Sequence, residues 1–372
     1  MLRAVAQVAF LAAVAAVGWY LFSNMQANLR QVGIPTGFGF LDQPTGFVIP
    51  DSDFRSTQSN LDALVVGIGN TARVALVGIA LATVVGVVVG VARLSTNWLV
   101  RTGAAIYVEA LRNVPVLVLI VFAFTAVFLK LPPIDDAIEW LGVVVFSNRG
   151  SSIPWARTGP GAGVWWAAVG LGLVGAGVVA VWRTRRSVAS GRPHHRLAWG
   201  GAVVVGVAVA GYLLLGTPLQ PDLPSRDGRV VTGGFRLGTE YSALLVALVV
   251  YTASHIAEVV RGSILAVPRG QAEAASALAL SGFQRLRFVI LPQALRIAVP
   301  PLGNQYLNLT KNSSLAVAIG FPEVTRLIRS LISQGSPAPQ AVAVLMLIYL
   351  GFSLALSLVV NLFNRRLTLV DR

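Results

Sequence analysis

The 372-residue sequence contains no cysteine and only three histidines. Without cysteine the chain forms no disulfide, no thiolate metal site and no thiol nucleophile. Two of the histidines, His194 and His195, are adjacent in an arginine-rich loop and lack the spacing of a metal-binding cluster. These shortages exclude a disulfide-stapled outer domain, and they predict that the chain holds no metal.

Phosphate-binding and catalytic motifs are also missing. The sequence has no G-x-x-x-x-G-K-[ST] loop, and its only two lysines, Lys130 and Lys311, stand in no such context. It shows no nucleophile with a neighbouring base and no paired acids within its apolar runs. We therefore expect a protein that is not an enzyme, has no catalytic residues, binds no cofactor and does not itself hydrolyse ATP.

Hydrophobic residues, in contrast, make up 55% of the chain and charged residues only 12%. This composition is typical of an all-α polytopic membrane protein. We predict eight transmembrane helices, including a retained first helix, because the first run exceeds the usual core of a signal peptide and no clear cleavage site follows it. The apolar runs cover residues 4–22, 63–92, 106–130, 163–182, 197–216, 241–262, 294–319 and 341–363.

The net charge of +14 has to be interpreted together with these runs. In a soluble chain such an excess suggests nucleic acid, but here the arginines gather in alternate short loops, such as Arg93, Arg101 and Arg112. Basic residues concentrate on the cytosolic side of membrane proteins. We therefore expect both termini and the loop at residues 268–292 in the cytosol, contact with membrane lipid and no nucleic-acid partner.

The chain divides into four predicted regions. Residues 1–60 carry the first helix and an outer loop, residues 61–130 the first part of a core, and residues 241–372 the second part. Residues 131–240 lie between the two core parts, and we interpret them as an insertion with two Gly/Ala/Val-rich helices that face lipid. No internal repeat is evident, so any symmetry has to come from a second subunit.

Residues 268–292 form the one long polar interval that has the pattern of a structured element. Pro268 suits a first helical turn, and Glu273 is expected in that turn, near the positive end of the helix dipole. Ser281-Gly282 is expected to break the helix, and Pro292 to end the basic turn that follows. An amphipathic helix on the lipid surface is the alternative. Small residues are expected to share one face: Ala272, Ala275, Ala279 and Gly282.

The residues of this interval carry a resemblance. Glu273-Ala274-Ala275, followed by Val289-Ile290-Leu291-Pro292, resembles the EAA loop of ABC importer permeases, with Ala279 and Val289 where the family has glycine and isoleucine. The resemblance implies a cytosolic coupling helix that docks into a groove on a separate ATPase. The ATPase-coupling residues it implies are Glu273, Ala274, Ala275, Ala279, Gly282, Leu291 and Pro292.

Two further strings pair a carboxylate with an arginine three residues later, on one helical face. Glu109, Arg112 and Pro115 form an intrahelical pair on the plain interpretation, and they also resemble the E-x-x-R-x-x-P signature of polar amino-acid permeases. Glu258 and Arg261 precede the coupling loop, and we expect them to tie their helix to it.

The run at residues 294–319 is unusually polar. Exposing a central lysine to lipid costs about 2.5–3.5 kcal/mol, so this run has to line a pathway or a protein interface. We favour the pathway, with contacts to the carboxylate and polar groups of an amino acid. The candidate residues are Asn304, Asn308, Lys311, Asn312, Ser313 and Ser314.

Taken whole, the sequence resembles a permease subunit of the polar (general L-) amino-acid uptake group. The resemblance implies a type I core of five helices, a bacterial inner-membrane location and ATP-driven import. It also implies a dimer of ATP-binding subunits that holds ATP and Mg, a homologous second permease subunit and a periplasmic amino-acid-binding protein. The alternative, an ion-gradient-driven secondary transporter or channel, predicts paired intramembrane acids, which the sequence lacks.

Overall fold

The computed structural model describes residues 2–33, 37–191, 195–216 and 218–367. His194 and the last residues of the predicted second core part, 368–372, lie outside these ranges. The chain is 73% helical, which confirms the predicted helical class. Six helices are long and apolar enough to cross a membrane, or seven if one bent pair counts as a single span.

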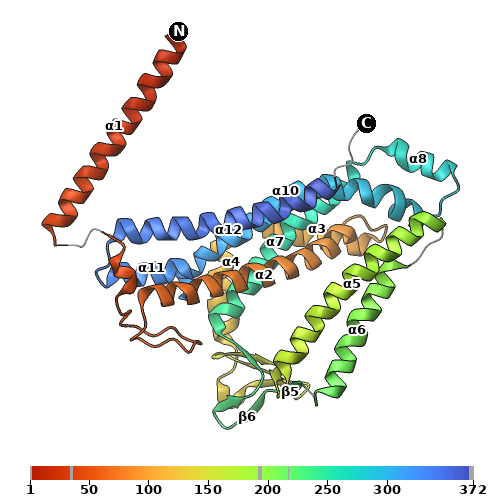
Figure 1. The fold of residues 1–372 in the computed structure, drawn as a ribbon, viewed down its shortest axis with the longest axis horizontal. Helices are drawn as coiled ribbons and strands as arrows, with labels where there is room; N and C mark the ends of the chain where they lie inside the picture. Colours follow the sequence, from red (N-terminus) through yellow and green to blue (C-terminus); the bar gives the residue numbers. More distant parts are fainter. Residues whose placement is uncertain (1, 34–36, 192–194, 217, 368–372) are drawn as a thin grey trace. The chain divides into compact units, whose positions relative to one another are not determined.

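The structure separates into two units, residues 1–130 with 238–372 and residues 131–237. The first unit is almost entirely helical (Figure 1). Its helices are α1 (Leu2–Gln31), α2 (Asn60–Ala92), α3 (Trp98–Arg112), α4 (Val116–Phe122), α7 (Thr239–Leu265), α8 (Arg269–Ala277), α9 (Gly282–Arg285), α10 (Leu291–Asn312), α11 (Val324–Ser333) and α12 (Ala338–Leu367).

Two of the eight predicted spans differ from expectation. The run at residues 106–130 is broken, because α3 and α4 meet at a bend of 100°. Pro115 is the cause, since it has no N–H to donate and disfavours helical backbone in the residue before it. The run at residues 294–319 forms α10, which is not among the apolar candidates. Its polar side chains and its internal Pro300 and Pro301 distinguish it from an ordinary span.

The centre of the first unit is the packing of α2 on α7. Gly86 and Gly90 stand one turn apart on α2, where a Cβ atom would lie 2.5 Å from Ile256 Cγ2 and 2.7 Å from the Ala257 carbonyl oxygen, respectively. Small residues at this spacing let two membrane helices approach closely. On α10, Gly303 has the same role against α12, where a Cβ would lie 2.6 Å from Val360.

One end of this unit is closed by α11, which packs on α2 and α12. Leu327, Ile328 and Leu331 are buried there in a cluster that also contains Phe40 and Leu64. The N-terminus of α11 is capped by the fully buried Glu323. Its carboxylate accepts hydrogen bonds from the Thr325 and Arg326 amides and from the Tyr349 hydroxyl, at 2.8–2.9 Å. The oxygens of this buried carboxyl group are therefore well satisfied.

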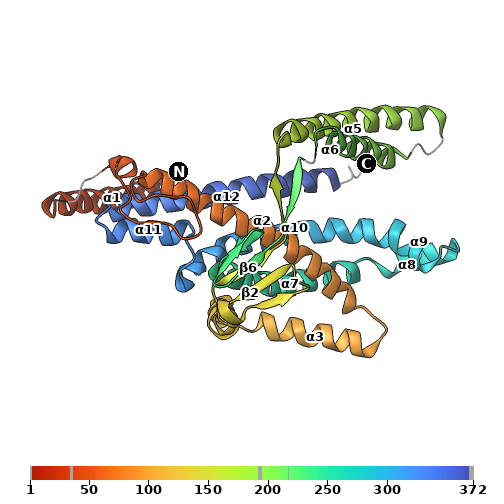
Figure 2. The same cartoon turned by 90° about the horizontal axis from the view of Figure 1, so that it is seen from below.

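The second unit combines two long helices with short strands (Figure 2). A four-stranded antiparallel sheet has the order β1 (Ile138–Trp140), β2 (Val144–Ser147), β3 (Gly150–Ile153), β8 (Phe235–Leu237). Two strand pairs accompany it: β4 (Trp155–Thr158) with β5 (Leu219–Asp222), and β6 (Ser225–Asp227) with β7 (Val230–Thr232). We did not predict these strands, because three or four residues are too few to show an alternating pattern.

The helices of this unit are α5 (Ala162–Ser190) and α6 (Arg196–Leu214). They pack on each other, with Trp165 Nε1 donating to the Ala208 carbonyl at 2.9 Å. Most of their side chains are exposed, Leu171 and Leu213 among them. An apolar helix pair with so little covered surface has the character of a lipid-facing hairpin.

Candidate functional site

The polar interval starts with α8. Pro268 is the N-cap of this helix, and Ala277 is its last residue. Ala279 has φ +55°, in the left-handed region, and its amide donates to the Ser276 carbonyl at 2.9 Å. The Leu280 amide donates to the Ala275 carbonyl at 3.2 Å. These are the two bonds of a Schellman motif, which normally has glycine in the left-handed position. α8 therefore ends at Ala277, before the predicted break at Ser281-Gly282.

Ser281 begins the next helix. Its hydroxyl accepts from the Gln284 amide and the Gln284 side chain accepts from the Ser281 amide, which makes a capping box. α9 continues through a π-helical turn, Leu286–Ile290, directly into α10. Pro292 is the second residue of α10, and the helical backbone runs through it from α9 without a break. The prediction that Pro292 ends the preceding turn is therefore wrong.

The predicted small-residue face also needs correction. Because α8 stops at Ala277, Ala279 and Gly282 cannot share a helical face with Ala272 and Ala275. Ala275 is buried, whereas Ala279 and Gly282 are exposed. Glu273 is the fifth residue of α8 and thus lies in its second turn, not in the first as predicted.

The structure instead presents a mixed exposed surface on this loop. Glu273 and Ala274 are exposed on α8, and two large apolar side chains of the same loop are also open, with Leu278 at 75% and Phe283 at 68% exposure. Large apolar side chains exposed on one loop are typical of a surface that a partner protein covers. We call these four residues the knob surface.

Hydrogen bonds hold the knob surface to the start of α10. Arg285 Nη1 donates to Ser276 Oγ at 2.8 Å, and this hydroxyl donates to the Ala272 carbonyl at 2.8 Å. Gln293 Nε2 donates to Gln271 Oε1 at 3.3 Å. Through these bonds α8, α9 and the first turn of α10 are linked. Leu291 and Pro292 are exposed at this joint.

Just before the loop, Glu258 and Arg261 form the predicted pair, with Arg261 Nη2 and Glu258 Oε1 2.6 Å apart. Arg93, the C-cap of α2, binds the other oxygen of the same carboxylate. We did not predict this third member. Two guanidinium groups therefore lock the C-terminal ends of α2 and α7 together, with Arg261 four residues before the last residue of α7. The signal in the sequence was the Gly86-x-x-x-Gly90 spacing, which brings Arg93 to α7.

The other candidate region is α10, which has two distinct faces. Ala294, Ala298 and Leu309 are buried against the neighbouring helices. Asn304, Asn308 and Lys311 are exposed, and their spacing of four and three residues sets them on one stripe. Within the described ranges no carboxylate lies within ion-pair distance of Lys311. We call these three residues the polar stripe.

The remaining residues predicted for the path lie differently. Ser313 is buried. Its hydroxyl donates to the Thr310 carbonyl at 2.7 Å, so it is already hydrogen-bonded to the backbone at the end of α10. Ser314 donates in the same way to the Lys311 carbonyl at 2.7 Å. Asn312 and Ser314 are half-buried. The structure thus brings Asn304, Asn308 and Lys311 together and sets Ser313 apart from them.

The chain is similar over most of its length to known transport proteins. Residues 230–369 match the family of binding-protein-dependent transport system inner membrane components. A general L-amino acid transport system permease protein of Rhizobium johnstonii is 39% identical over 95% of this chain and 89% of its own length. A putative amino-acid ABC transporter permease protein of Escherichia coli is 39% identical over 98% of this chain and 93% of its own length.

A third relative, from Rhodobacter capsulatus, is 34% identical over 95% of this chain and 90% of its own length. It is a glutamate/glutamine/aspartate/asparagine transport system permease protein. The chain is an amino-acid ABC transporter permease. The predicted family and the predicted function are thereby confirmed. The knob surface lies within the matched residues 230–369, as does the polar stripe.

The second motif of the permease, at the end of α3, has another geometry than its spacing predicted. Glu109 and Arg112 are both exposed, and no ion pair joins them among the described residues. Arg112 is the last residue of α3, and Pro115 is the N-cap of α4. The string therefore coincides with the 100° bend between two helices. Tyr107 holds α3 in place by donating to the Val250 carbonyl at 2.7 Å.

Proposed function

We propose that this permease is the membrane-crossing subunit of an importer for L-amino acids in a bacterial inner membrane. Its partners are a dimer of ATP-binding subunits that holds ATP and Mg, a homologous second permease subunit and a periplasmic amino-acid-binding protein. The permease itself carries out no catalysis, and both its termini lie in the cytosol. The single observation that carries the proposal is the knob surface, exposed and rigidly joined to the helix with the polar stripe.

The first step of the proposed mechanism is docking at the knob surface. Leu278 and Phe283 offer apolar area to a groove on the ATPase, and Glu273 offers a charge that fixes its orientation. A short helix laid in a groove is a common recognition mode. Because the Schellman motif and the capping box hold both ends of the turn, the surface stays in shape when it is pushed.

The second step is transmission to α10. The bonds Arg285–Ser276 and Gln293–Gln271 couple α8 to the start of α10, and the π-helical turn leaves no loop between α9 and α10. Movement of the ATPase therefore displaces α10 as a rigid body, because no flexible loop lies between α9 and α10 to take up the movement. Arg93, Glu258 and Arg261 fix the α2–α7 pair as the stationary part.

The third step concerns the substrate. A lysine and two asparagines on an exposed stripe of a membrane helix require water or protein as their neighbour, because lipid exposure is too costly. A path closed by a second permease subunit satisfies this requirement. Lys311 then meets the carboxylate of the amino acid, and Asn304 and Asn308 offer amide groups to its polar atoms.

Transport by the reconstituted complex in liposomes tests the proposal. Glu273→Ala is expected to reduce the recovery of ATPase subunits with the permease and to lower ATP-dependent uptake about tenfold or more, whereas Asp53→Ala, at an exposed acid of the segment before α2, leaves both unchanged. Uptake that continues without ATP and collapses with a protonophore contradicts the proposal and supports a secondary transporter. Lys311→Ala with unaltered uptake and apparent affinity contradicts the substrate role alone.

A further inference from the structure

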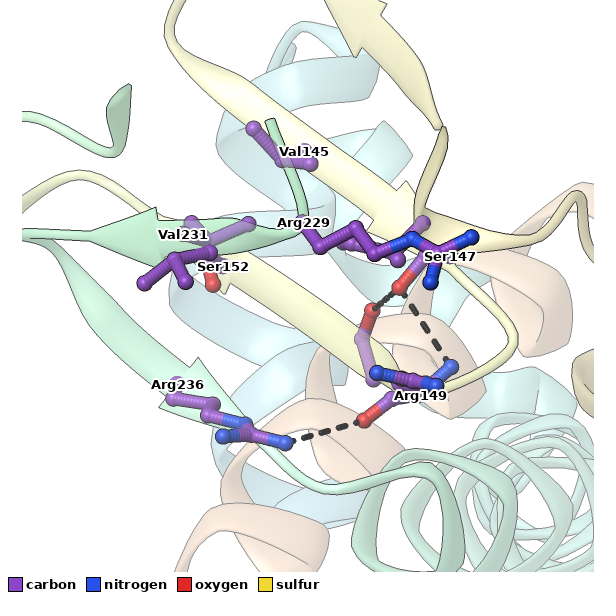
Figure 3. A pocket seen from close by; sticks show the side chains of 10 residues that line it. Val145, Ser147, Arg149, Ser152, Arg229, Val231 and Arg236 are labelled. Atoms are coloured by element: carbon purple, nitrogen blue, oxygen red, sulfur yellow. Dashed lines mark hydrogen bonds between the residues drawn. The ribbon is translucent and has the colours of Figure 1, made fainter. Parts of the chain in front are cut away.

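The second unit contains a pocket with no assigned role. It lies on the four-stranded sheet and is lined by side chains from β2, β3, β7 and β8 and from the turns between them, with a volume of about 250 Å³ (Figure 3). That volume is near the lower limit of about 300 Å³ for ordinary small-molecule pockets. The pocket therefore has room for a small ligand or for one side chain of a partner.

The floor of the pocket is buried and carries two hydroxyl groups. Ser147 and Ser152 are 2% and 6% exposed. Ser147 Oγ donates to the Gly150 carbonyl at 3.1 Å and accepts from the Arg149 amide at 3.3 Å. Figure 3 shows Ser152 beside Val231 in the lining of the pocket. The Ser152 hydroxyl can therefore offer a hydrogen bond to a ligand there.

The rim of the pocket is made of arginines. Arg149, Arg229 and Arg236 all line it, and none of the lining residues is acidic. Arg229 Nε donates to Asp135 at 2.9 Å, and Arg236 Nη2 donates to the Arg149 carbonyl at 3.4 Å. The Arg149 guanidinium has no carboxylate within ion-pair distance in the described part of the chain. The one carboxylate at this rim, Asp135, is thus hydrogen-bonded to Arg229, and the positive charge of Arg149 is left in excess.

This excess also acts on Asp135. Arg229, Arg149 and Arg226 together hold the pKa of its carboxyl below the usual range, with the Arg229 hydrogen bond as the largest cause. Arg226 is already occupied by Glu139, with Nε 2.9 Å from Oε1. The arginines at the rim would thus attract a second negatively charged group in addition to Asp135. Arginine is suited to carboxylates because its planar fork donates two parallel hydrogen bonds.

From these observations we infer that the second unit binds a carboxylate group between Arg149, Arg229 and the hydroxyl of Ser152. The group comes either from a small free dicarboxylate, or from an acidic side chain on the periplasmic protein that delivers the substrate. The chemistry at the pocket is the same for both sources. Residues 131–160 and 218–237 flank the α5–α6 hairpin in the chain, so they emerge on one side of the membrane.

The test uses the full-length permease in lipid nanodiscs, titrated with sodium succinate at constant ionic strength, with neutral glutamine as the comparison ligand. We expect saturable binding of succinate that Arg149→Gln weakens about tenfold, because a charged hydrogen bond is lost. Ser152→Ala is expected to weaken it by a smaller factor. Arg157→Gln is the matched control, since Arg157 is 69% exposed in the same unit but does not line the pocket.

A second arm identifies the source of the carboxylate. The purified amino-acid-binding protein of the transporter is titrated onto the same nanodiscs, again with the variants Arg149→Gln and Arg157→Gln. Weakening by Arg149→Gln alone, in either arm, supports the carboxylate site and shows which source fills it. If Arg149→Gln and Arg157→Gln bind with equal affinity in both arms, the proposed carboxylate site is wrong. Lys311→Ala leaves succinate binding unchanged if the site is the pocket, and this result does not depend on whether the transport mechanism proposed above holds.

Discussion

Two of the predicted membrane helices, α10 and α5, have opposite designs. α5 is apolar throughout its crossing part, and most of its side chains are open. α10 buries small and apolar residues on one face and exposes Asn304, Asn308 and Lys311 on another. α5 can satisfy its whole surface with lipid, while α10 needs a protein or water-filled neighbour. The function of the permease is therefore expected in the helix that hydropathy alone would reject.

The largest difference is expected from glycine substitutions, which compare the closely packed α2 of the first unit with the open α5 of the second. At Gly86, on the α2 face that packs on α7, Gly86→Val places its Cβ 2.5 Å from Ile256, and relief requires the two helices to separate. We expect a loss of about 3 kcal/mol or more, seen as a strongly lowered thermal unfolding midpoint and loss of transport. The matched change on α5 is Gly177→Val, where nothing lies within 4 Å of the added Cβ. An equal loss from both variants contradicts the assigned close approach.

The arginine–carboxylate pairs of the two units give the next difference. Arg93→Ala leaves the half-buried Glu258 with one guanidinium in place of two. We expect destabilisation by about 1–3 kcal/mol. Arg157→Ala breaks a looser pair with Asp222, at 3.7 Å and with the arginine 69% exposed, and is expected to cost about 0–1 kcal/mol. Thermal unfolding of both variants in detergent compares them, and a larger loss for Arg157→Ala rules out the interhelical lock.

The coupling loop offers a comparison within a single turn. Ala279 has the left-handed backbone that glycine tolerates better, so Ala279→Gly is expected to stabilise the loop by about 1 kcal/mol. Two residues earlier, Ala277 is still helical, and Ala277→Gly is expected to destabilise by about 0.5–1 kcal/mol. Hydrogen exchange of the loop amides measures both. Slower exchange in Ala279→Gly and faster exchange in Ala277→Gly is the expected result, and the same sign in both excludes the Schellman geometry.

Much of this permease was predictable from its sequence, for physical reasons that differ by region. Long apolar runs announce membrane helices because the bilayer sets their length, and the spacing of Val324, Ile328 and Leu331 indicates the buried face of α11. The pairing of Glu258 with Arg261 follows from helical periodicity. In each of these cases the decisive interaction is local in sequence or is imposed by the solvent.

The features that the sequence did not predict depend on contacts distant in the chain or on backbone details. Arg93 reaches Glu258 across 165 positions. The end of α8 is set by the backbone of Ala279, whose alanine side chain gives no sign of a left-handed residue. Two of the strand pairings in the second unit, β3 with β8 and β4 with β5, join segments separated by the α5–α6 hairpin. The pocket on that sheet could not be foreseen for the same reason.

The smallest expected effect is a dependence on pH confined to the second unit. The Arg229 guanidinium holds the pKa of Asp135 below its usual value, so the ion pair stabilises the folded unit above the ordinary carboxyl pKa. This contribution is lost as the pH falls through the lowered pKa. Asp135→Asn is expected to remove the acid-side slope in the exchange of β6 and β7 amides, while α5 amides keep their behaviour. If the wild-type slope persists in Asp135→Asn, the pair is not its source. Because Asp135 also offsets part of the arginine charge, the same variant should bind succinate more tightly at neutral pH, which links this pair to the pocket beside it.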